Sequence, residues 1–158
     1  MDRPGENARL PLMAYNFKVV VAAMTLGFKE VSGLARQHET LTYRHGQSCF
    51  EGEQIVKFYQ EQHAPVTLSK GVIPGVVGFL HAWLETRVEV PMTVSLCNAR
   101  GIPLVNWNLA RVLPIKLTAP TFEATSNDVA IETLEVMAAG ITIENPAPLS
   151  LPSFPSQK

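Results

Sequence analysis

Alternation between apolar and polar positions is the dominant pattern along this chain. Over residues 13–21 the odd positions carry apolar or aromatic side chains, whereas the even positions up to Lys18 are small or polar. A period of two with aromatic and β-branched residues predicts a strand with one buried face. Similar alternation over residues 90–97 and 104–112 predicts two further strands, and a short apolar segment at 66–72 predicts another.

The segment between the predicted strands at 13–21 and 66–72 is less regular. Residues 25–27 indicate a turn, and Gly33, inside the next strand pattern, indicates a bulge or a close approach of another backbone. Residues 36–44 alternate, but neither face is apolar enough for a deep core. Such a strand lies at a sheet edge, lines a wet channel or pairs with another chain. Residues 45–63 break the pattern and predict a long excursion with exposed apolar groups.

Residues 74–86 carry the one convincing helical pattern. Its apolar stripe has helical spacing and consists of Val76, Phe79, Leu80, Trp83 and Leu84. Pro74 suits the first helical turn. His81 lies off the stripe, so we expect it to be solvated rather than a ligand.

The C-terminal third predicts a hairpin followed by an ambiguous segment. Residues 98–101 (NARG) suit a hairpin turn, and Pro114 and Pro120 mark a sheet edge or a bend. Residues 129–140 fit a helical stripe capped by Asn127 or Asp128, and the local pattern favours this helix. The alternative is a strand, which requires a bulge near residues 132 and 133.

Composition adds limits on size, environment and partners. A chain of 158 residues with net charge −1 suits one domain and gives no basic excess for nucleic acid. Charged residues make up only 17%, which favours oligomerisation. Cys49 and Cys97 form no metal or redox motif, so free thiols in a reducing cytosol are favoured over a disulfide. We expect no signal peptide and no membrane anchor, because the N-terminus is polar and the longest apolar run is short.

Candidate catalytic groups are not arranged as a site. The four histidines have no metal-ligand spacing, and residues 71–75 lack the lysine and serine of a phosphate-binding loop. Glu132 and Glu135 are expected to be solvated acids. Cys49 lies near His45 without a third group to orient them. The sequence therefore predicts neither an enzyme nor a cofactor site.

Five phrases, in order, resemble the inner tail-tube proteins of contractile tails. They are residues 27–34 (GFKEVSGL), residues 42–46 (TYRHG), residues 66–72 (VTLSKGV) with the following helix around Trp83, Trp107 with residues 114–116 (PIK), and residues 122–132 (FEATSNDVAIE). The family comprises the T4-like phage tube proteins and relatives in extracellular contractile injection particles of the antifeeding-prophage and Photorhabdus virulence-cassette type. The resemblance covers residues 13–143.

The resemblance implies a mainly β fold, a barrel or sandwich with one flanking helix near residues 74–86. Six copies would form a ring, rings would stack into a hollow tube, and long hairpins would join into one intersubunit sheet around the lumen. It implies a strand rather than a helix at 129–137. Residues 1–12 would be a flexible leader, 13–143 the tube domain and 144–158 a proline-rich tail.

The implied partners are other copies of the chain, a surrounding sheath protein, and a baseplate hub or tube paralogue. The protein would be made in the cytoplasm and then become part of a virion tail or a released injection particle. Trp83 and Trp107 are the expected core anchors. The candidate interface residues are Glu39, Leu41, Tyr43, Arg44, Phe50, Ile55, Phe58, Tyr59, Ile131 and Glu132.

Two departures from the family pattern bear on the place in the tube. Residues 45–48 (HGQS) lead into a longer, more hydrophobic segment than the family phrase, and the proline-rich tail is extra. Both suit a specialised copy, such as the first ring on the baseplate hub. The alternative function is a monomeric β-sandwich module that binds carbohydrate or a small ligand, which would need aromatic residues clustered on an exposed face.

Overall fold

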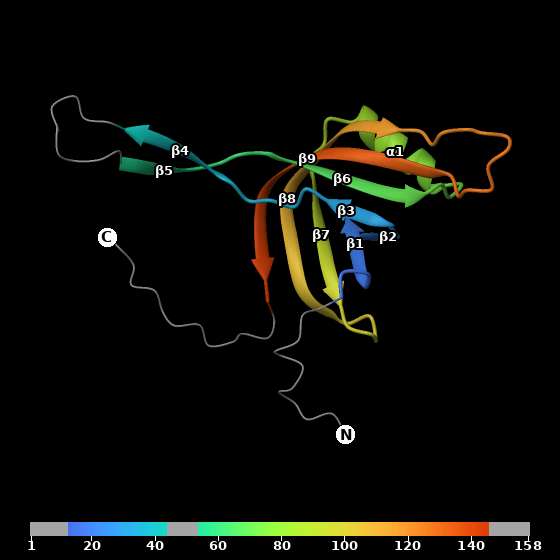
Figure 1. Cartoon of the computed structure of the whole chain (residues 1–158), viewed down its shortest axis with the longest axis horizontal. Coiled ribbons are helices and arrows are strands. Elements are labelled where there is room, and N and C mark those ends of the chain that lie inside the picture. Colours follow the sequence, from blue (N-terminus) through green and yellow to red (C-terminus); the bar gives the residue numbers. More distant parts are fainter. Residues whose placement is uncertain (1–12, 44–53, 146–158) are drawn as a thin grey trace, which may run out of the picture.

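The computed structural model describes residues 13–43 and 54–145 (Figure 1). Nine strands and one helix follow in chain order: β1 (Phe17–Val21), β2 (Met24–Leu26), β3 (Glu30–Ser32), β4 (His38–Tyr43), β5 (Gln54–Glu61), β6 (Ala64–Gly71), α1 (Val76–Glu85), β7 (Val90–Cys97), β8 (Pro103–Thr118) and β9 (Ile131–Glu144). The expected mainly β fold with one helix is confirmed. The predicted leader 1–12 and most of the predicted tail lie outside the described residues.

Seven strands form one antiparallel sheet in the order β2-β1-β7-β8-β9-β6-β3. Within the part of the chain that the structure describes, strands β4 and β5 pair only with each other, and they extend away from the body of the molecule (Figure 1). β8 and β9 form the longest hairpin, and its connecting loop, residues 119–130, projects at the opposite end of the molecule (Figure 1). Strand β5 corrects the expectation that residues 45–63 form an irregular excursion throughout.

The turn between β7 and β8 forms as its residue types predict. The Asn98 backbone N–H donates to the Ile102 carbonyl at 2.9 Å. The Asn98 side-chain Oδ1 accepts from the backbone N–H groups of Arg100 and Ile102. Gly101 has a φ of +76°, a conformation that glycine adopts without steric cost.

Strand β8 continues through Pro114, which the sequence placed at an edge or a bend. Pairing of β7 with β8 ends at Val90 opposite Val112. Beyond that point β8 pairs with β9 alone, and its register shifts between Pro114 and Lys116. A residue without a backbone N–H is tolerated at such a position because no ladder hydrogen bond is lost on the β7 side.

Strand β9 occupies the segment for which the local pattern favoured a helix, so that prediction is wrong and the strand implied by the family resemblance is confirmed. Its buried positions alternate and include Glu132, Leu134, Val136 and Ala138. The charged Glu132 stands on the core-facing side and therefore hides the alternation in the sequence. The register shift lies on β8 rather than near residues 132 and 133.

Gly140, the last residue of the helix that the local pattern favoured, lies inside β9 with a φ of +71°. An added Cβ would come within 2.8 Å of the Ala110 Cβ on β8. Beyond this point the buried positions move to Ala139 and Ile141. Glycine thus allows a close approach of two strands where the buried face of β9 changes.

The first hairpin begins later and turns earlier than the pattern indicated. Met13 and Tyr15 precede β1 and are exposed. The turn lies at Ala22 and Ala23, which both have positive φ, and residues 24–26 form β2 instead of the predicted turn. Alanine is uncommon in the left-handed region, so residue type gave no signal there.

Gly33 follows β3 with a φ of +85°, and a Cβ there would lie 2.3 Å from the Pro65 carbonyl oxygen. The close backbone approach predicted at this glycine is confirmed. It lets β3 pair with β6, with Val31 opposite Leu68.

Helix α1 packs its apolar stripe against the sheet. Leu80 is fully buried and Trp83 is 6% exposed. The indole N–H of Trp83 donates to the Val88 carbonyl at 3.4 Å. Pro74 lies just before the helix, whose N-cap is Gly75. The fully buried core residues include Val19, Val66, Leu80, Val112, Val136 and Ala138.

Candidate assembly surfaces

The β4–β5 hairpin is the largest feature without a packing layer from the rest of the described chain. Its two strands pair antiparallel, with Leu41 opposite Val56 and Thr42 opposite Ile55. It belongs to no other sheet, and in the described residues its substantial contacts are between its own two strands. A two-stranded hairpin is marginally stable in water by itself. A further surface packed against this arm would therefore stabilise it.

The pairing of β4 with β5 contains an irregularity at the base of the hairpin. The pairing runs from His38 opposite Glu61 to Thr40 opposite Lys57, which shifts the register. Such bulges bend a strand and increase its twist. The shift lies at the end of the hairpin that is nearer to the seven-stranded sheet (Figure 1).

Six of the ten candidate interface residues lie on this hairpin. Their backbones are described, and they are Glu39, Leu41 and Tyr43 on β4 and Ile55, Phe58 and Tyr59 on β5. Arg44 and Phe50 lie outside the described residues. The structure thus brings two separate stretches of candidates together on one arm, through a pairing that the sequence reading of residues 45–63 missed.

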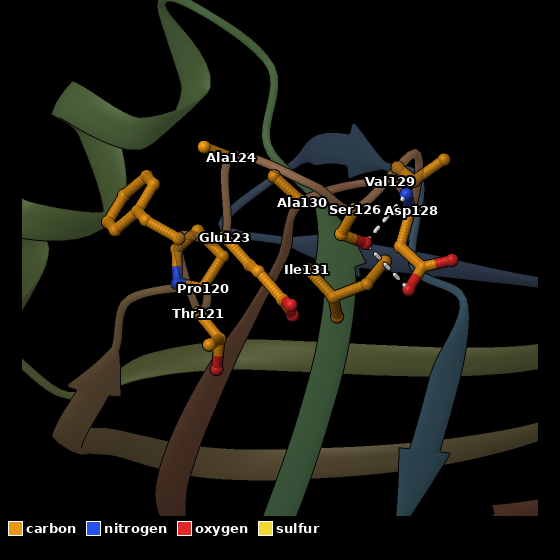
Figure 2. A pocket seen from close by; sticks show the side chains of 10 residues that line it. Pro120, Thr121, Glu123, Ala124, Ser126, Asp128, Val129, Ala130 and Ile131 are labelled. Atoms are coloured by element: carbon orange, nitrogen blue, oxygen red, sulfur yellow. Dashed lines mark hydrogen bonds between the residues drawn. The ribbon is translucent and has the colours of Figure 1, made fainter.

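The loop between β8 and β9 forms a second exposed surface. Phe122 is 84% exposed and Val129 is 74% exposed. Ten residues of the segment 120–131 line an open hollow of about 740 Å³ (Figure 2). The candidate Ile131 lies half-buried at its base.

Local hydrogen bonds hold the loop in shape. The Ser126 hydroxyl donates to Asp128 Oδ2 at 2.9 Å and accepts from the Asp128 backbone N–H at 3.1 Å (Figure 2). The Thr125 hydroxyl donates to Glu123 Oε1 at 3.0 Å. Side-chain bonds of this kind favour turns. The loop therefore presents its apolar side chains on an ordered frame.

A buried ion pair stands where this loop meets the sheet. Lys70 Nζ lies 2.7 Å from Glu132 Oε1, and the side chains are 2% and 4% exposed. The two residues are direct partners on β6 and β9. Glu132 was expected to be a solvated acid, and that prediction is wrong. Its carboxylate is engaged within its own chain, whereas Glu135 forms an exposed ion pair with Lys116 at 3.1 Å.

The two tryptophans differ in their surroundings. Trp83 is buried in the core, whereas Trp107 is half-buried and packs against its margin. Trp107 stands on β8 directly opposite Ile143 on β9, whose side chain is 65% exposed.

The described residues contain no group of three or more histidine, cysteine or acidic side chains placed to hold a metal ion. Cys97 is a buried free thiol. The Cys49 and His45 pair considered from the sequence lies outside the described residues. Within residues 13–43 and 54–145, helix α1 is too short to cross a bilayer.

Among residues 13–38 and 62–145, whose side chains the structure describes, the exposed aromatic rings do not gather as a carbohydrate-binding surface would require. Tyr15 and Phe122 are the aromatic residues among the large exposed apolar side chains of these two ranges. Tyr15 precedes β1, and Phe122 belongs to the loop between β8 and β9.

Comparisons with known proteins point to one family. The family model described as the T4-like virus tail tube protein gp19 matches residues 13–142. A chain from the cryo-EM structure of the anti-feeding prophage cap is 31% identical, with a TM-score of 0.77 over 87% of this chain and 93% of that one. A sequence search of curated proteins found no match.

Two structures of an extracellular contractile injection system, PVC, give similar values. A chain from its sheath–tube complex in the extended state is 32% identical, with a TM-score of 0.76 over 87% of this chain and 93% of that one. A chain from its sheath/tube terminator is 32% identical, with a TM-score of 0.75 over 86% and 98%.

Proposed function

The chain belongs to the T4-like virus tail tube protein family, and we propose that six copies form a ring and that rings stack into the inner tube of a contractile tail or injection particle. The family consists of structural tube proteins, so the chain is a structural subunit rather than an enzyme.

The observation that carries the proposal is the β4–β5 arm. It has two paired strands and no covering layer in the described chain. Six arms packed side by side would form one sheet closed around a lumen, which removes free edges that otherwise promote aggregation. Each subunit would contact the next through a different surface, the head-to-tail arrangement that closes into rings.

The loop between β8 and β9 suits contact between stacked rings or with the sheath. It projects at the opposite end from the arm and exposes Phe122 and Val129. Burying one such side chain contributes about 1.5–3 kcal/mol, so six copies of the loop would add substantially to the cohesion of a stack. The resemblance to chains from sheath–tube complexes supports a sheath partner.

A second place in the same assembly is the first ring on the baseplate hub. The departure of residues 45–63 from the family phrase favours it, because the tip of the arm would then meet a different partner. The two places differ in what the purified chain builds. A trunk subunit extends into long tubes, whereas a first-ring subunit stops at single rings until a tube paralogue is added.

The test of the proposal removes the arm. In the variant, a short glycine–serine linker replaces residues 39–60, and sedimentation velocity compares it with the full chain. We expect rings or tubes for the full chain and monomers for the variant. The circular dichroism spectrum and thermal midpoint of the variant should stay close to those of the full-chain monomer, because β4 and β5 lie outside the seven-stranded sheet. A variant that still forms rings would refute the role of the arm.

A full chain that stays monomeric, alone and with its baseplate neighbours, would refute ring assembly itself. The binding-module alternative predicts this monomeric behaviour.

A further inference from the structure

An apolar groove runs along one margin of the seven-stranded sheet. It has a volume of about 400 Å³ and lies between the segment around edge strand β3 and strands β1, β7 and β8. Its lining includes Phe17, Leu34, Leu96 and Trp107, each only partly buried, and the exposed Lys29 and Glu30 on the side of β3. The size falls within the range of ligand pockets. Two aromatic and several aliphatic side chains thus face an open space at the margin of the core.

Trp107 has a polar group that the described chain does not use. Its indole N–H donates no hydrogen bond within residues 13–43 and 54–145, whereas that of Trp83 donates to the Val88 carbonyl. A partly buried indole N–H usually finds an acceptor. An occupant of the groove would therefore offer both apolar groups and a carbonyl oxygen.

The segment after β9 has this chemistry. Residues 146–158 (PAPLSLPSFPSQK) contain four prolines, three large apolar residues and a single charged residue, Lys158. Proline-rich segments adopt the polyproline II helix, whose carbonyl groups make no internal hydrogen bonds. Such helices bind grooves lined by aromatic side chains.

The course of β9 brings this segment to the groove. Ile143 is paired with Trp107, and β9 ends at Glu144. Directly opposed residues of an antiparallel pair share a face of the sheet. From Asn145, a polyproline II segment reaching Phe154 spans about 28 Å. The N-terminal segment leads into Ala14 at the same groove, but its residues 2–9 carry four charges, Asp2, Arg3, Glu6 and Arg9, and match a mainly apolar lining less well.

We propose that the proline-rich segment 146–155 binds in this groove of its own chain, with its carbonyl groups facing the indole N–H of Trp107. Tethering raises the effective concentration of the segment to about the millimolar range, so modest contacts suffice. This assignment does not depend on ring assembly, and a subunit in any state is expected to show it.

The first experiment measures how well the segment covers Trp107 in the full chain. Hydroxyl-radical footprinting with mass spectrometry compares the natural sequence with L149S/L151S/F154S. We expect the oxidation rate of Trp107 to rise several-fold in the variant, while that of Trp83 stays unchanged. The control S150A/S153A/S156A lies in the same segment and should leave both rates unchanged. Equal Trp107 rates in all three proteins would overturn the proposal.

The second experiment identifies which chain provides the segment. The photo-reactive residue benzoylphenylalanine replaces Phe154 in full chains labelled with ¹⁴N or ¹⁵N, which are mixed as dissociated subunits, reassembled and irradiated. We expect cross-links to peptides containing Leu34, Leu96 or Trp107, with both halves carrying the same isotope. Cross-links of mixed isotope would place the segment on a neighbouring copy, and cross-links elsewhere on the chain would place it outside the groove. Either result would overturn the proposal.

Discussion

Replacing Glu132 by glutamine keeps the size of the side chain but removes the charge from a buried ion pair. Lys70 Nζ and Glu132 Oε1 are 2.7 Å apart, and the two side chains are 2% and 4% exposed. The variant therefore leaves a buried ammonium group without its counter-charge. Removing one partner of such a pair costs about 3–5 kcal/mol of unfolding free energy. For a domain with about 5–15 kcal/mol of stability, this loss is a large fraction of the total.

Urea denaturation of dissociated subunits, followed by tryptophan fluorescence at one fixed protein concentration, measures this loss. Fixed concentration matters because assembly adds to apparent stability. The matched control is E135Q, three residues along the same strand. Glu135 and Lys116 are 3.1 Å apart but 37% and 62% exposed. Solvent-exposed pairs of this kind contribute about 0–1 kcal/mol.

A double variant separates the charge from the packing. K70M/E132L replaces both partners by apolar side chains, and such replacements are often neutral or stabilising by about 1–4 kcal/mol. We therefore expect the double variant to be at least as stable as the natural chain. If E132Q lowers the unfolding free energy no more than E135Q does, then Lys70 and Glu132 do not form a buried ion pair.

Three further changes test other parts of the account. G33A should lower the unfolding free energy by at least about 1–2 kcal/mol, because a Cβ at φ +85° meets the Pro65 carbonyl oxygen at 2.3 Å. Its control G78A has open space around the added Cβ and should raise the unfolding free energy by up to about 1 kcal/mol. Equal effects of the two variants in urea titrations would contradict this. I131P should lower the thermal midpoint of the isolated subunit, because residue 131 is paired with Gly71 in β6, and an unchanged midpoint would mean that this pairing is absent. F122S should leave subunit stability within about 0.5 kcal/mol, because the ring is 84% exposed, but shorten the assembled tubes in electron micrographs; tubes of unchanged length would exclude this loop from the stacking contact.

The sequence predicted those elements whose signals are local. The Asn98 to Gly101 turn, the helix with Leu80 and Trp83 on one face, and the close approach at Gly33 each depend on residues near one another in the chain. Alternation likewise located β1, β7 and most of β8, because one face of each strand is apolar.

The remaining features depend on contacts between distant segments. In the sequence, Glu132 resembles a solvated acid, because its partner Lys70 lies far away in the chain, on β6. A charged residue on the core-facing side of β9 hides the alternation of that strand, and the local pattern therefore favoured a helix. Strand β5 has no strong alternation of its own, so it is recognised as a strand only through its pairing with β4. The turn at Ala22 and Ala23 gave no residue-type signal, because alanine rarely adopts positive φ.

The candidate site was predicted only in part. The strand around Leu41 and Tyr43 was singled out because neither of its faces is apolar enough for a deep core, and the structure places it on the projecting arm. The exposed surface around Phe122 was not among the predicted site residues, because a loop carries no periodicity that distinguishes an exposed ring from a buried one. The exposure of the apolar side chains Phe122 and Val129 on loop 119–130 follows from the fold and not from the local sequence.

Cryo-electron microscopy of the purified full chain tests the central claim most directly. We expect rings with six-fold symmetry in which the β4–β5 arms of neighbouring subunits form one continuous sheet around a lumen. A monodisperse monomer, or rings in which the arms lie apart from one another, would contradict the account.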